Sequence, residues 1–562
     1  MTDLVAKTRR IVAPAVLAAG TLTAALAAAP AAANDQLVIG ISQFPDNFNP
    51  KINSMAAKSY ILNMARRPIT TFDADWNLIC MLCTELPSRE NGRARYEKTA
   101  KGKDGVAVTY TLRPDAKWGD GTPITTKDVV FSWKVGKNPK TGVSNAEFYR
   151  RITKIDVADD RTFTLHVNKR TCSYANVNDF NIVPAHIEKA TFAAPKEYRK
   201  RSAYETDTTN PGLWYGPYKV VEVDPGSHVV LERNPTWWGE KPKFDRVIVK
   251  AIQNTAAMTA NLLAGGIDYI SGEIGMTLDQ AMALKKRHGD RFQFVFKPSL
   301  VYEHIDINLD NPILSDRRVR RALIHAIDRK AISSELFDGY QPVAHSGVNP
   351  LDSVYHAGAR QYSYDPAEAR KLLEEAGWRH LRDGIRYNDM GERLQLQFMT
   401  TAGNKTRELV QQALQSNWRQ VGIDIRVRNQ PARVFFGTTV RRRKFPALAM
   451  YAWLSSPQNV PRNQLHSDQI PSEENSWAGQ NYPGFKSPMM DSLLDKVETV
   501  CDEKKNMKAW AEMQAMYAEQ LPAIPLYFRA QPHIMSNWLK GVRPTGHQYA
   551  STLWIETWYR GE

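Results

Sequence analysis

The sequence of 562 residues lacks the short motifs that mark common catalytic sites. It contains no Gly-x-Ser-x-Gly elbow, no His-Glu-x-x-His zinc helix, no phosphate loop and no dinucleotide fingerprint. Its 12 His are scattered, without a pair at the spacing of metal ligands. We therefore expect no enzyme, no metal and no cofactor. A secreted hydrolase of peptides or glycans stays as the alternative, because carboxylates abound and a glycosidase pair needs no local motif.

Long apolar runs are also missing, except near the N-terminus. Lys7, Arg9 and Arg10 precede an Ala-rich apolar run over 11–29, and Ala31–Ala33 offers small residues for cleavage. This pattern predicts a signal peptide over 1–33, removed near Ala33, and a transmembrane anchor is the competing interpretation. No Cys follows the cleavage site, so we expect no lipoprotein anchor and predict a secreted protein.

The net charge of +15 does not come from a dense basic stretch. Without the three cations and one anion of the signal it is +13. Modest clusters stand at Arg317–Arg321 and Arg441–Lys444. The first lies on a predicted helix with a separate apolar stripe, so its arginines are expected mostly to face water. Because the excess is dispersed, we expect no nucleic-acid partner.

Cysteine is scarce, with Cys80, Cys83, Cys172 and Cys501 as the whole set. Outside the cytoplasm thiols usually oxidise, and four cysteines allow three full pairings among which sequence does not choose. The spacing Cys80-Met-Leu-Cys83 favours a local structural disulfide. Free thiols, and a metal or redox motif, are the alternatives.

The stretch Val106–Val135 shows the sequence signals of a strand, a turn and a helix start most clearly. Val106, Val108 and Tyr110 alternate with small or polar residues, which predicts a half-buried strand. Asp120-Gly121 predicts a tight turn. Thr125, with Asp128 three residues later, predicts the N-cap of a helix.

Strand and helix patterns continue through the rest of the chain. They predict strands at 36–42, 162–167, 219–223, 229–232, 247–251 and 423–427, and helices near 56–65, 366–376, 410–421, 490–497 and 507–517. Mixed strands and helices over this length predict α/β lobes.

A series of motifs, in order along the chain, resembles one family, the bacterial extracellular solute-binding proteins of family 5, the dipeptide- and oligopeptide-binding receptors of ABC importers. They are Tyr110–Pro114, Trp118–Pro123, Thr125 with Asp128–Ser132, Gly216–Tyr218 and Arg233–Trp238, then Leu263–Asp268, Asp316–Arg329, Tyr364–Pro366 with Gly377-Trp378, and Asn481-Tyr482 with Asp491. They span nearly the whole chain after the signal.

The resemblance implies a two-lobed α/β periplasmic-binding-protein type II fold with an additional α/β module on the first lobe. Lobe I would cover 34–75, 206–304 and 529–562, the extra module 76–205, and lobe II 305–528. The chain would cross between the lobes near Glu303-His304 and Phe528-Arg529. The implied function is periplasmic capture of a peptide or peptide-like solute by hinge closure, by a monomer, and delivery to the membrane permease subunits of an ABC importer.

In peptide-binding relatives a second-lobe segment with a Trp and a nearby Asp contributes to the pocket. The matching segment here is Tyr451–Asn459, with Trp453 as the first site candidate. Polar residues stand where the acid is expected, namely Ser455, Ser456, Gln458 and Asn459. A buried ammonium without a carboxylate is costly, so recognition of a free amino terminus is in question. In the alternative, Asp46, Glu473 or Glu474 supplies the acid.

Polar and aromatic loops supply the remaining ligand-binding candidates, because aromatic rings give apolar area and Asn both donates and accepts hydrogen bonds. With Trp453, Ser455 and Asn459 already named, they are Phe44, Asn47 and Asn49 in the first lobe and Trp477, Asn481 and Tyr482 in the second.

Overall fold

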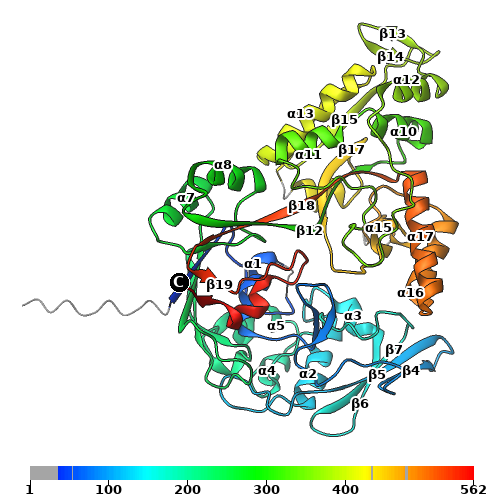
Figure 1. Cartoon of the computed structure of the whole chain (residues 1–562). Coiled ribbons are helices and arrows are strands. Elements are labelled where there is room, and N and C mark those ends of the chain that lie inside the picture. The colour runs from blue at the N-terminus through cyan, green and yellow to red at the C-terminus, as the bar shows by residue number, and fades with distance from the viewer. Residues whose placement is uncertain (1–35, 53–54, 432–433, 475–478) are drawn as a thin grey trace, which may run out of the picture. The chain divides into compact units, whose positions relative to one another are not determined.

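A ten-stranded mixed sheet runs through the computed structural model, which describes residues 36–52, 55–431, 434–474 and 479–562 (Figure 1). The strand order is β16-β15-β17-β12-β18-β11-β1-β10-β9-β8. The strands are β1 (Gln36–Ile41), β8 (Tyr218–Asp224), β9 (His228–Arg233), β10 (Arg246–Ala251), β11 (Tyr269–Ile270), β12 (Phe292–Ile307), β15 (Gln395–Met399), β16 (Asp424–Val427), β17 (Leu448–Leu454) and β18 (Ala523–Ser536). The predicted signal over 1–33 lies outside the described residues.

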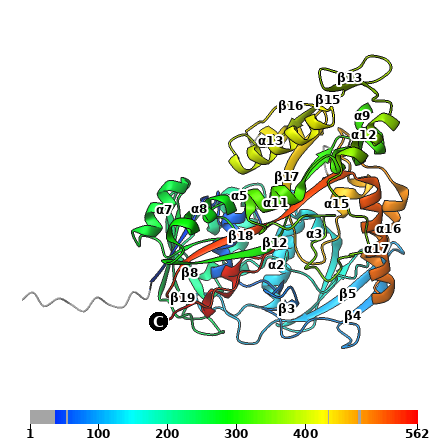
Figure 2. The ribbon, with the colours of Figure 1, turned by 45° about the horizontal axis from the view of Figure 1, so that its top comes forward.

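Two long antiparallel strands, β12 and β18, connect the two ends of this sheet. Figures 1 and 2 show them side by side over most of their length. We call the part around β1, β8, β9, β10 and β11 lobe I, and the part around β15, β16 and β17 lobe II. The β12–β18 pairing shifts register between Pro298 and Tyr302 and again between Glu303 and His304. These irregularities lie at the passage from one lobe to the other, where a bulge bends the strands.

Helices cover the sheet in both lobes. Lobe I carries α1 (Ala56–Ala65), α7 (Thr255–Leu263), α8 (Leu278–His288) and η4 (Ser551–Thr557). Lobe II carries α9 (Pro312–Ser315), α10 (Arg317–His325), α11 (Arg329–Phe337), α12 (Pro366–Glu375), α13 (Lys405–Gln420), η2 (Phe435–Val440), α15 (Arg462–Leu465), η3 (Ser467–Gln469), α16 (Pro488–Thr499) and α17 (Glu503–Gln520). None of the helices in the described ranges is long and apolar enough to cross a membrane.

A separate four-stranded sheet, in the order β4-β5-β7-β6, forms the extra module, which we call the module. It comprises β4 (Ala94–Lys98), β5 (Asp104–Thr111), β6 (Ile152–Val157) and β7 (Thr162–Val167), with α2 (Thr126–Lys137), α3 (Ala146–Arg151), α4 (Ala185–Phe192), α5 (Tyr198–Arg201) and α6 (Ala203–Thr206). Short elements complete the chain: β2 (Thr70–Phe72), β3 (Leu78–Cys80), η1 (Pro211–Leu213), β13 (His380–Arg382), β14 (Ile385–Tyr387), β19 (Leu539–Lys540) and β20 (Tyr559–Arg560).

The predicted strand, turn and helix of Val106–Val135 are confirmed. Thr125 caps α2 with a full capping box, since its own N–H donates to Asp128 Oδ2 at 2.9 Å. The Asp120 carboxylate accepts the N–H of Thr122 at 2.9 Å and so closes the turn. Asp128 also accepts the N–H of Ala185 at 2.9 Å, which holds α4 against α2. These two acids are structural.

Each part has its own apolar core, and the module packs on lobe I. The module cluster includes Val108, Tyr110 and Leu165. The lobe I cluster, built around β1 and α1, also takes in Phe131 and Val135 of α2. A third cluster lies between α10, α12 and α13 and the strands of lobe II. The mixed α/β character predicted from the sequence is confirmed.

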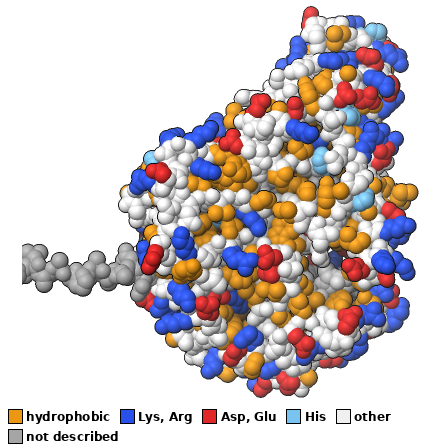
Figure 3. Space-filling view, viewed as in Figure 1, with side chains coloured by type: hydrophobic (Ala, Val, Ile, Leu, Met, Phe, Trp, Pro, Cys, Tyr) orange, Lys and Arg blue, Asp and Glu red, His pale blue; other side chains and the backbone are white. Residues whose placement is uncertain are grey.

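Arg320 of the basic helix α10 is an exception to the expectation that its arginines mostly face water, whereas Arg317 and Arg318 are about half exposed. Arg320 is only 5% exposed, because its guanidinium donates to the carbonyls of Gln520 at 2.8 Å and Leu314 at 2.9 Å. It therefore satisfies carbonyls at the C-terminal ends of α9 and α17 inside lobe II. Elsewhere the charge is dispersed, and the face in Figure 3 shows Lys and Arg interspersed with Asp and Glu.

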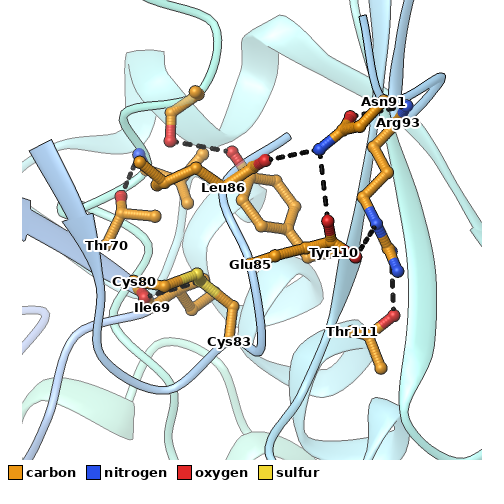
Figure 4. Close-up of a disulfide and its surroundings, with 12 residues drawn as sticks. Ile69, Thr70, Cys80, Cys83, Glu85, Leu86, Asn91, Arg93, Tyr110 and Thr111 are labelled. Atoms are coloured by element: carbon orange, nitrogen blue, oxygen red, sulfur yellow. Dashed lines mark hydrogen bonds and ion pairs between the residues drawn. A yellow bond between two sulfur atoms is a disulfide. The ribbon is translucent and has the colours of Figure 1, made fainter. Parts of the chain in front are cut away.

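Both disulfides of the structure are now assigned. Cys80 is paired with Cys83, at the end of β3 and beside Ile69 and Tyr110 (Figure 4). The second disulfide joins Cys172 to Cys501 across 329 residues of sequence, with the two Cα atoms 5.1 Å apart. This second bond links the module to the turn between α16 and α17 of lobe II.

Candidate functional site

A cavity of about 380 Å³ lies between the module and lobe II, and we call it the central cavity. Its module wall includes Asn176, Asn178 and Asp179, and its lobe II wall includes Ser456 and Asn459. The C-terminal segment of lobe I adds Gln548 and Tyr549. Its volume lies in the usual range of small-molecule sites.

The rim of the central cavity is closed by contacts between the module and lobe II. Besides the disulfide, the N–H of Cys172 donates to the Glu498 carbonyl at 2.8 Å. The Glu498 carboxylate is ion-paired with Lys169 of the module and with Arg462 of lobe II. This edge is therefore held by a covalent bond, a backbone hydrogen bond and a charge network.

Lobe I and lobe II also touch directly. The N–H of Gln548 donates to the Ser455 carbonyl at 3.2 Å, and Thr406 Oγ1 of α13 donates to Asp279 Oδ1 of α8 at 2.8 Å. The structure is thus a closed arrangement, in which both lobes contribute to one set of cavity walls.

A second cavity of about 370 Å³, the lobe I cavity, adjoins the first. Both cavities are lined by Asn178, Asp179, Gln548 and Tyr549, and the lobe I cavity adds Lys58 and Arg66 among its other residues. The two spaces therefore meet at the 178–179 loop of the module and the 548–549 segment.

Asp179 stands where the two cavities meet. Water reaches its side chain, but the cavity walls remove part of its hydration and raise the pKa of its carboxyl. Asp179 Oδ2 accepts a hydrogen bond from Asn145 Nδ2 at 2.9 Å. Over the described part of the chain, no ion pair to Asp179 is present.

Two of the predicted lobe I residues hold a lysine that lines the lobe I cavity. Lys58 Nζ donates to Asn47 Oδ1 at 3.1 Å and to the Asn49 carbonyl at 2.9 Å. Burial lowers the pKa of Lys58 to about 8. Asn49 is fully buried and also donates to Ser202 Oγ at 2.9 Å. Asn47 and Asn49 therefore position Lys58 and do not themselves line these cavities.

Trp453 lines a smaller cavity of about 90 Å³ inside lobe II, the tryptophan cavity. Its ring stacks on Tyr482, with centroids 6.0 Å apart and planes at 22°, and on His304, with centroids 6.4 Å apart. Ser455 and Asn459 line the same cavity, and Asn459 also lines the central cavity. The structure thus brings together four of the predicted lobe II residues.

Other candidates do not reach these cavities. Asn481 is fully buried, donates to the carbonyls of His466 at 3.0 Å and Phe485 at 2.8 Å, and accepts from the N–H of Phe485 at 2.9 Å. Its polar groups are thus committed to holding its own loop. Phe44 packs edge-to-face on Phe48 against the lobe I core. Trp477 lies outside the described residues.

Charged groups are concentrated at the passage between the lobes. Glu303 of β12 is fully buried and contacts Arg407 at 2.7 Å and Arg529 at 2.5 Å. Burial would raise the pKa of Glu303, but the two guanidinium groups outweigh it and lower the pKa to about 2. The neighbouring Asp306 accepts from Tyr451 and contacts His304 at 3.2 Å.

The described residues contain no group of three or more His, Cys, Asp or Glu arranged to hold a metal ion. The geometry is that of a cavity with walls from the module, from lobe II and from the C-terminal segment of lobe I. Such an arrangement binds a ligand when the parts close around it.

The model of the bacterial extracellular solute-binding proteins, family 5 middle region, matches residues 96–472. The chain belongs to the bacterial extracellular solute-binding proteins of family 5. The sequence-based resemblance is thereby confirmed. Proteins of this family bind solutes, and the described cavity lies within the matched region for most of its walls.

Individual relatives match most of the length of this chain. The oligopeptide-binding protein AppA of Bacillus subtilis is 26% identical over 93% of this chain and 91% of its own. The periplasmic oligopeptide-binding protein OppA of Escherichia coli is 24% identical over 81% of this chain and 82% of its own. The crystal structure of an oligopeptide-binding protein from Thermus thermophilus, complexed with a pentapeptide, is 30% identical with a TM-score of 0.75. It covers 94% of this chain and 96% of that one.

Sequence reasoning missed Asp179, Gln548 and Tyr549. They stand in loops without helical or strand periodicity, and only the fold brings residues 369 positions apart to one cavity. A local signal for Asp179 exists in the polar run Asn176-Val-Asn-Asp179, although such runs also occur in ordinary turns.

Proposed function

We propose that this family 5 protein is the receptor of an ABC importer that captures peptides or peptide-like solutes in the central cavity. The observation that carries the proposal is the composition of that cavity. Asn178 and Asp179 of the module face Ser456 and Asn459 of lobe II, so that both surfaces contact a ligand only in the closed arrangement. Ligand binding then favours closure by its differential affinity for the closed state.

The named relatives support this choice of ligand. AppA and OppA are named as oligopeptide-binding proteins, and the Thermus thermophilus structure holds a pentapeptide. The amide and hydroxyl groups of the cavity can donate to and accept from a peptide backbone. The protein acts as a carrier without catalysis, outside the cytoplasm, and its partner is the importer's permease.

The division of the chain is part of this proposal. Lobe I, the module and lobe II keep the boundaries expected from the sequence, at 34–75 with 206–304 and 529–562, at 76–205, and at 305–528. The separate apolar cores and the register shifts of β12 near Glu303 support the division. The permease subunits would recognise the closed arrangement of the lobes.

A retention assay tests the proposal. The full protein without its signal is incubated with a random pool of di- to hexapeptides, separated by gel filtration and denatured, and the released peptides are identified by mass spectrometry. A receptor retains a subset of the pool at about one peptide per protein and returns it uncleaved. A pool that is cleaved would favour the hydrolase, and a pool from which nothing is retained would refute peptide capture.

A further inference from the structure

The sequence does not show which acid takes the place of the Asp expected near Trp453, and few acids of the structure line the cavities described above. Beside Trp453 stand Ser455, Ser456 and Asn459, none of which carries a charge. The sequence alternatives Asp46, Glu473 and Glu474 line neither the central nor the lobe I cavity. The acids that do line these two cavities are Asp179 and Glu498.

Glu498 is already committed to other cations. Its carboxylate pairs with Lys169 and lies 3.5 Å from Arg462 Nη1. Asp179 has an amide, Asn145, as its side-chain hydrogen-bond donor. Since a carboxylate offers about four acceptor positions, Asp179 retains capacity for a donor arriving in the cavity.

The cations of the central cavity do not compete for that position. Arg151 is paired with Glu147 at 3.4 Å, and Lys169 is paired with Glu498. The remaining cations, Lys58 and Arg66, line the lobe I cavity together with Asp179. The charge of Arg66 opposes the rise in the pKa of Asp179, but the two side chains form no ion pair in the described structure. A positive group that enters the central cavity therefore meets one acid, Asp179, that forms no ion pair with a cation among the described wall residues.

We propose that Asp179 binds the ammonium group of the ligand, so that the protein selects short peptides or peptide-like amines with a free amino terminus. This inference rests on the proposed function. The acid comes from the module wall, opposite the lobe II segment where the sequence leads one to expect it. A ligand anchored at Asp179 extends through the central cavity toward Asn459 and the tryptophan cavity, because Asn459 lines both.

The physical basis is the cost of a buried ammonium. An ammonium that leaves water needs a charged or multiple hydrogen-bond partner, and bonds between ionised groups are the strong ones. The ammonium would also lower the pKa of Asp179, which the cavity walls raise in the free protein. A volume of about 380 Å³ suits a short ligand.

The test compares one peptide pool in two chemical forms. The full-length mature protein, the Asp179→Asn variant and the Asp115→Asn control are each offered the free-amine pool and its N-acetylated copy, and retained peptides are counted by mass spectrometry. Asp115 is an exposed module acid paired with Arg113 and lines none of the three cavities. Thermal unfolding of all three proteins checks that the variants fold.

The expected result is retention of free-amine peptides by the wild type and the control, and a loss of at least about tenfold in the Asp179→Asn variant. Equal retention of free-amine peptides by a folded Asp179→Asn variant would overturn the role of Asp179 and leave the proposed function standing. Equal retention of both pools by the wild type would overturn it as well. If the wild type retains neither pool, the proposed function fails and this inference with it.

A different observation, the disulfide between Cys172 and Cys501, carries a second inference. The bond ties the module to the α16–α17 turn of lobe II and fixes their Cα atoms at 5.1 Å. It lies on the rim of the central cavity, which Cys172 itself lines. A hinge that opens the whole cleft would have to separate these two residues.

We infer that this disulfide is a redox-sensitive latch. While it is intact, ligand exchange proceeds by separation of the other edge, where Gln548 meets Ser455. A dithiol reductant breaks the S–S bond by thiol–disulfide exchange. It passes two electrons and two protons to the two sulfurs and becomes a disulfide itself. Among the described residues, the edge is then held by the Lys169–Glu498 pair and the backbone hydrogen bond, and the cleft can open fully.

Small-angle scattering of the full protein tests the latch without a known ligand. The Cys172→Ser/Cys501→Ser variant, and the wild type treated with a dithiol, should show a larger radius of gyration than the oxidised wild type. The Cys80→Ser/Cys83→Ser variant is the matched control and should not. Equal radii in all samples would overturn the latch, and so would alkylation of Cys172 and Cys501 in natively purified protein.

Discussion

The carboxylate of Glu303 on β12 lies 2.5 Å from the guanidinium of Arg529 on β18, inside the protein and at the passage between the two lobes. Arg407 of α13 contacts the same carboxylate at 2.7 Å. The sequence resemblance places both crossings of the chain at these strands. The charged cluster therefore ties the long strands to a helix of lobe II at the point where hinge motion would be centred.

We predict that Glu303→Gln destabilises the protein by about 3–5 kcal/mol at pH 7, because it leaves the buried guanidinium of Arg407 and the partly buried guanidinium of Arg529 without their anion. The pKa of Glu303 is lowered to about 2 in the folded protein. Its stabilising effect is thus present above the unfolded pKa of about 4.5 and is lost as the pH falls toward 2. Chemical denaturation across pH 7 to 2.5 should show the gap between wild type and variant narrowing below pH 4.5. A gap that stays constant over this range would contradict the role of the cluster.

Trp453→Ala should leave the fold intact and weaken binding of a retained peptide by about 1–3 kcal/mol. The substitution removes the ring that stacks on Tyr482 and His304 and that forms one wall of the tryptophan cavity. Calorimetric titration measures the change. Trp237→Ala is the matched control, because Trp237 lines none of the cavities described above. Unchanged affinity in the Trp453 variant would remove this residue from the site.

Asn481→Ala separates a structural from a binding role. All three hydrogen bonds of the Asn481 side chain go to its own loop or to His466, so we expect a loss of roughly 1–3 kcal/mol in stability. The affinity of the folded variant for a retained peptide should not change. A tenfold loss of affinity at an unchanged melting temperature would return Asn481 to the binding site.

Thr125→Ala tests the role of the stretch Val106–Val135, whose strand, turn and helix signals are the clearest in the sequence. Removing the cap of α2 should lower stability by about 1 kcal/mol without altering ligand affinity, because the cap frames the module and lines no cavity. Thermal unfolding and titration measure the two quantities. An effect on affinity alone would mean that this stretch takes part in binding.

Local patterns predicted much of the fold. The periodicity of Val106–Tyr110, the cap at Thr125 and the helix expected near 366–376 all correspond to elements of the structure. In each of these cases the determining interactions lie within a few residues. Propensity and capping act at that range, so sequence alone carries the information.

The site depended on contacts of another kind. Asp179 becomes a cavity residue only because the fold brings Gln548 and Tyr549 beside it, and Cys172 finds Cys501 across 329 residues. Asn481 carries the same chemical groups as a ligand contact, yet neighbouring backbone groups engage them. Residue type does not distinguish these outcomes; tertiary structure does.

Photo-crosslinking locates the ligand and tests the central claim most directly. Peptides retained by the protein are remade with a photoreactive amino acid, irradiated in the complex, and the labelled residues are mapped by mass spectrometry. We predict labels on both walls of the central cavity, in 176–179 of the module and in 456–460 of lobe II. Labels confined to one of these walls, or lying outside the cavity, would contradict capture between the module and lobe II.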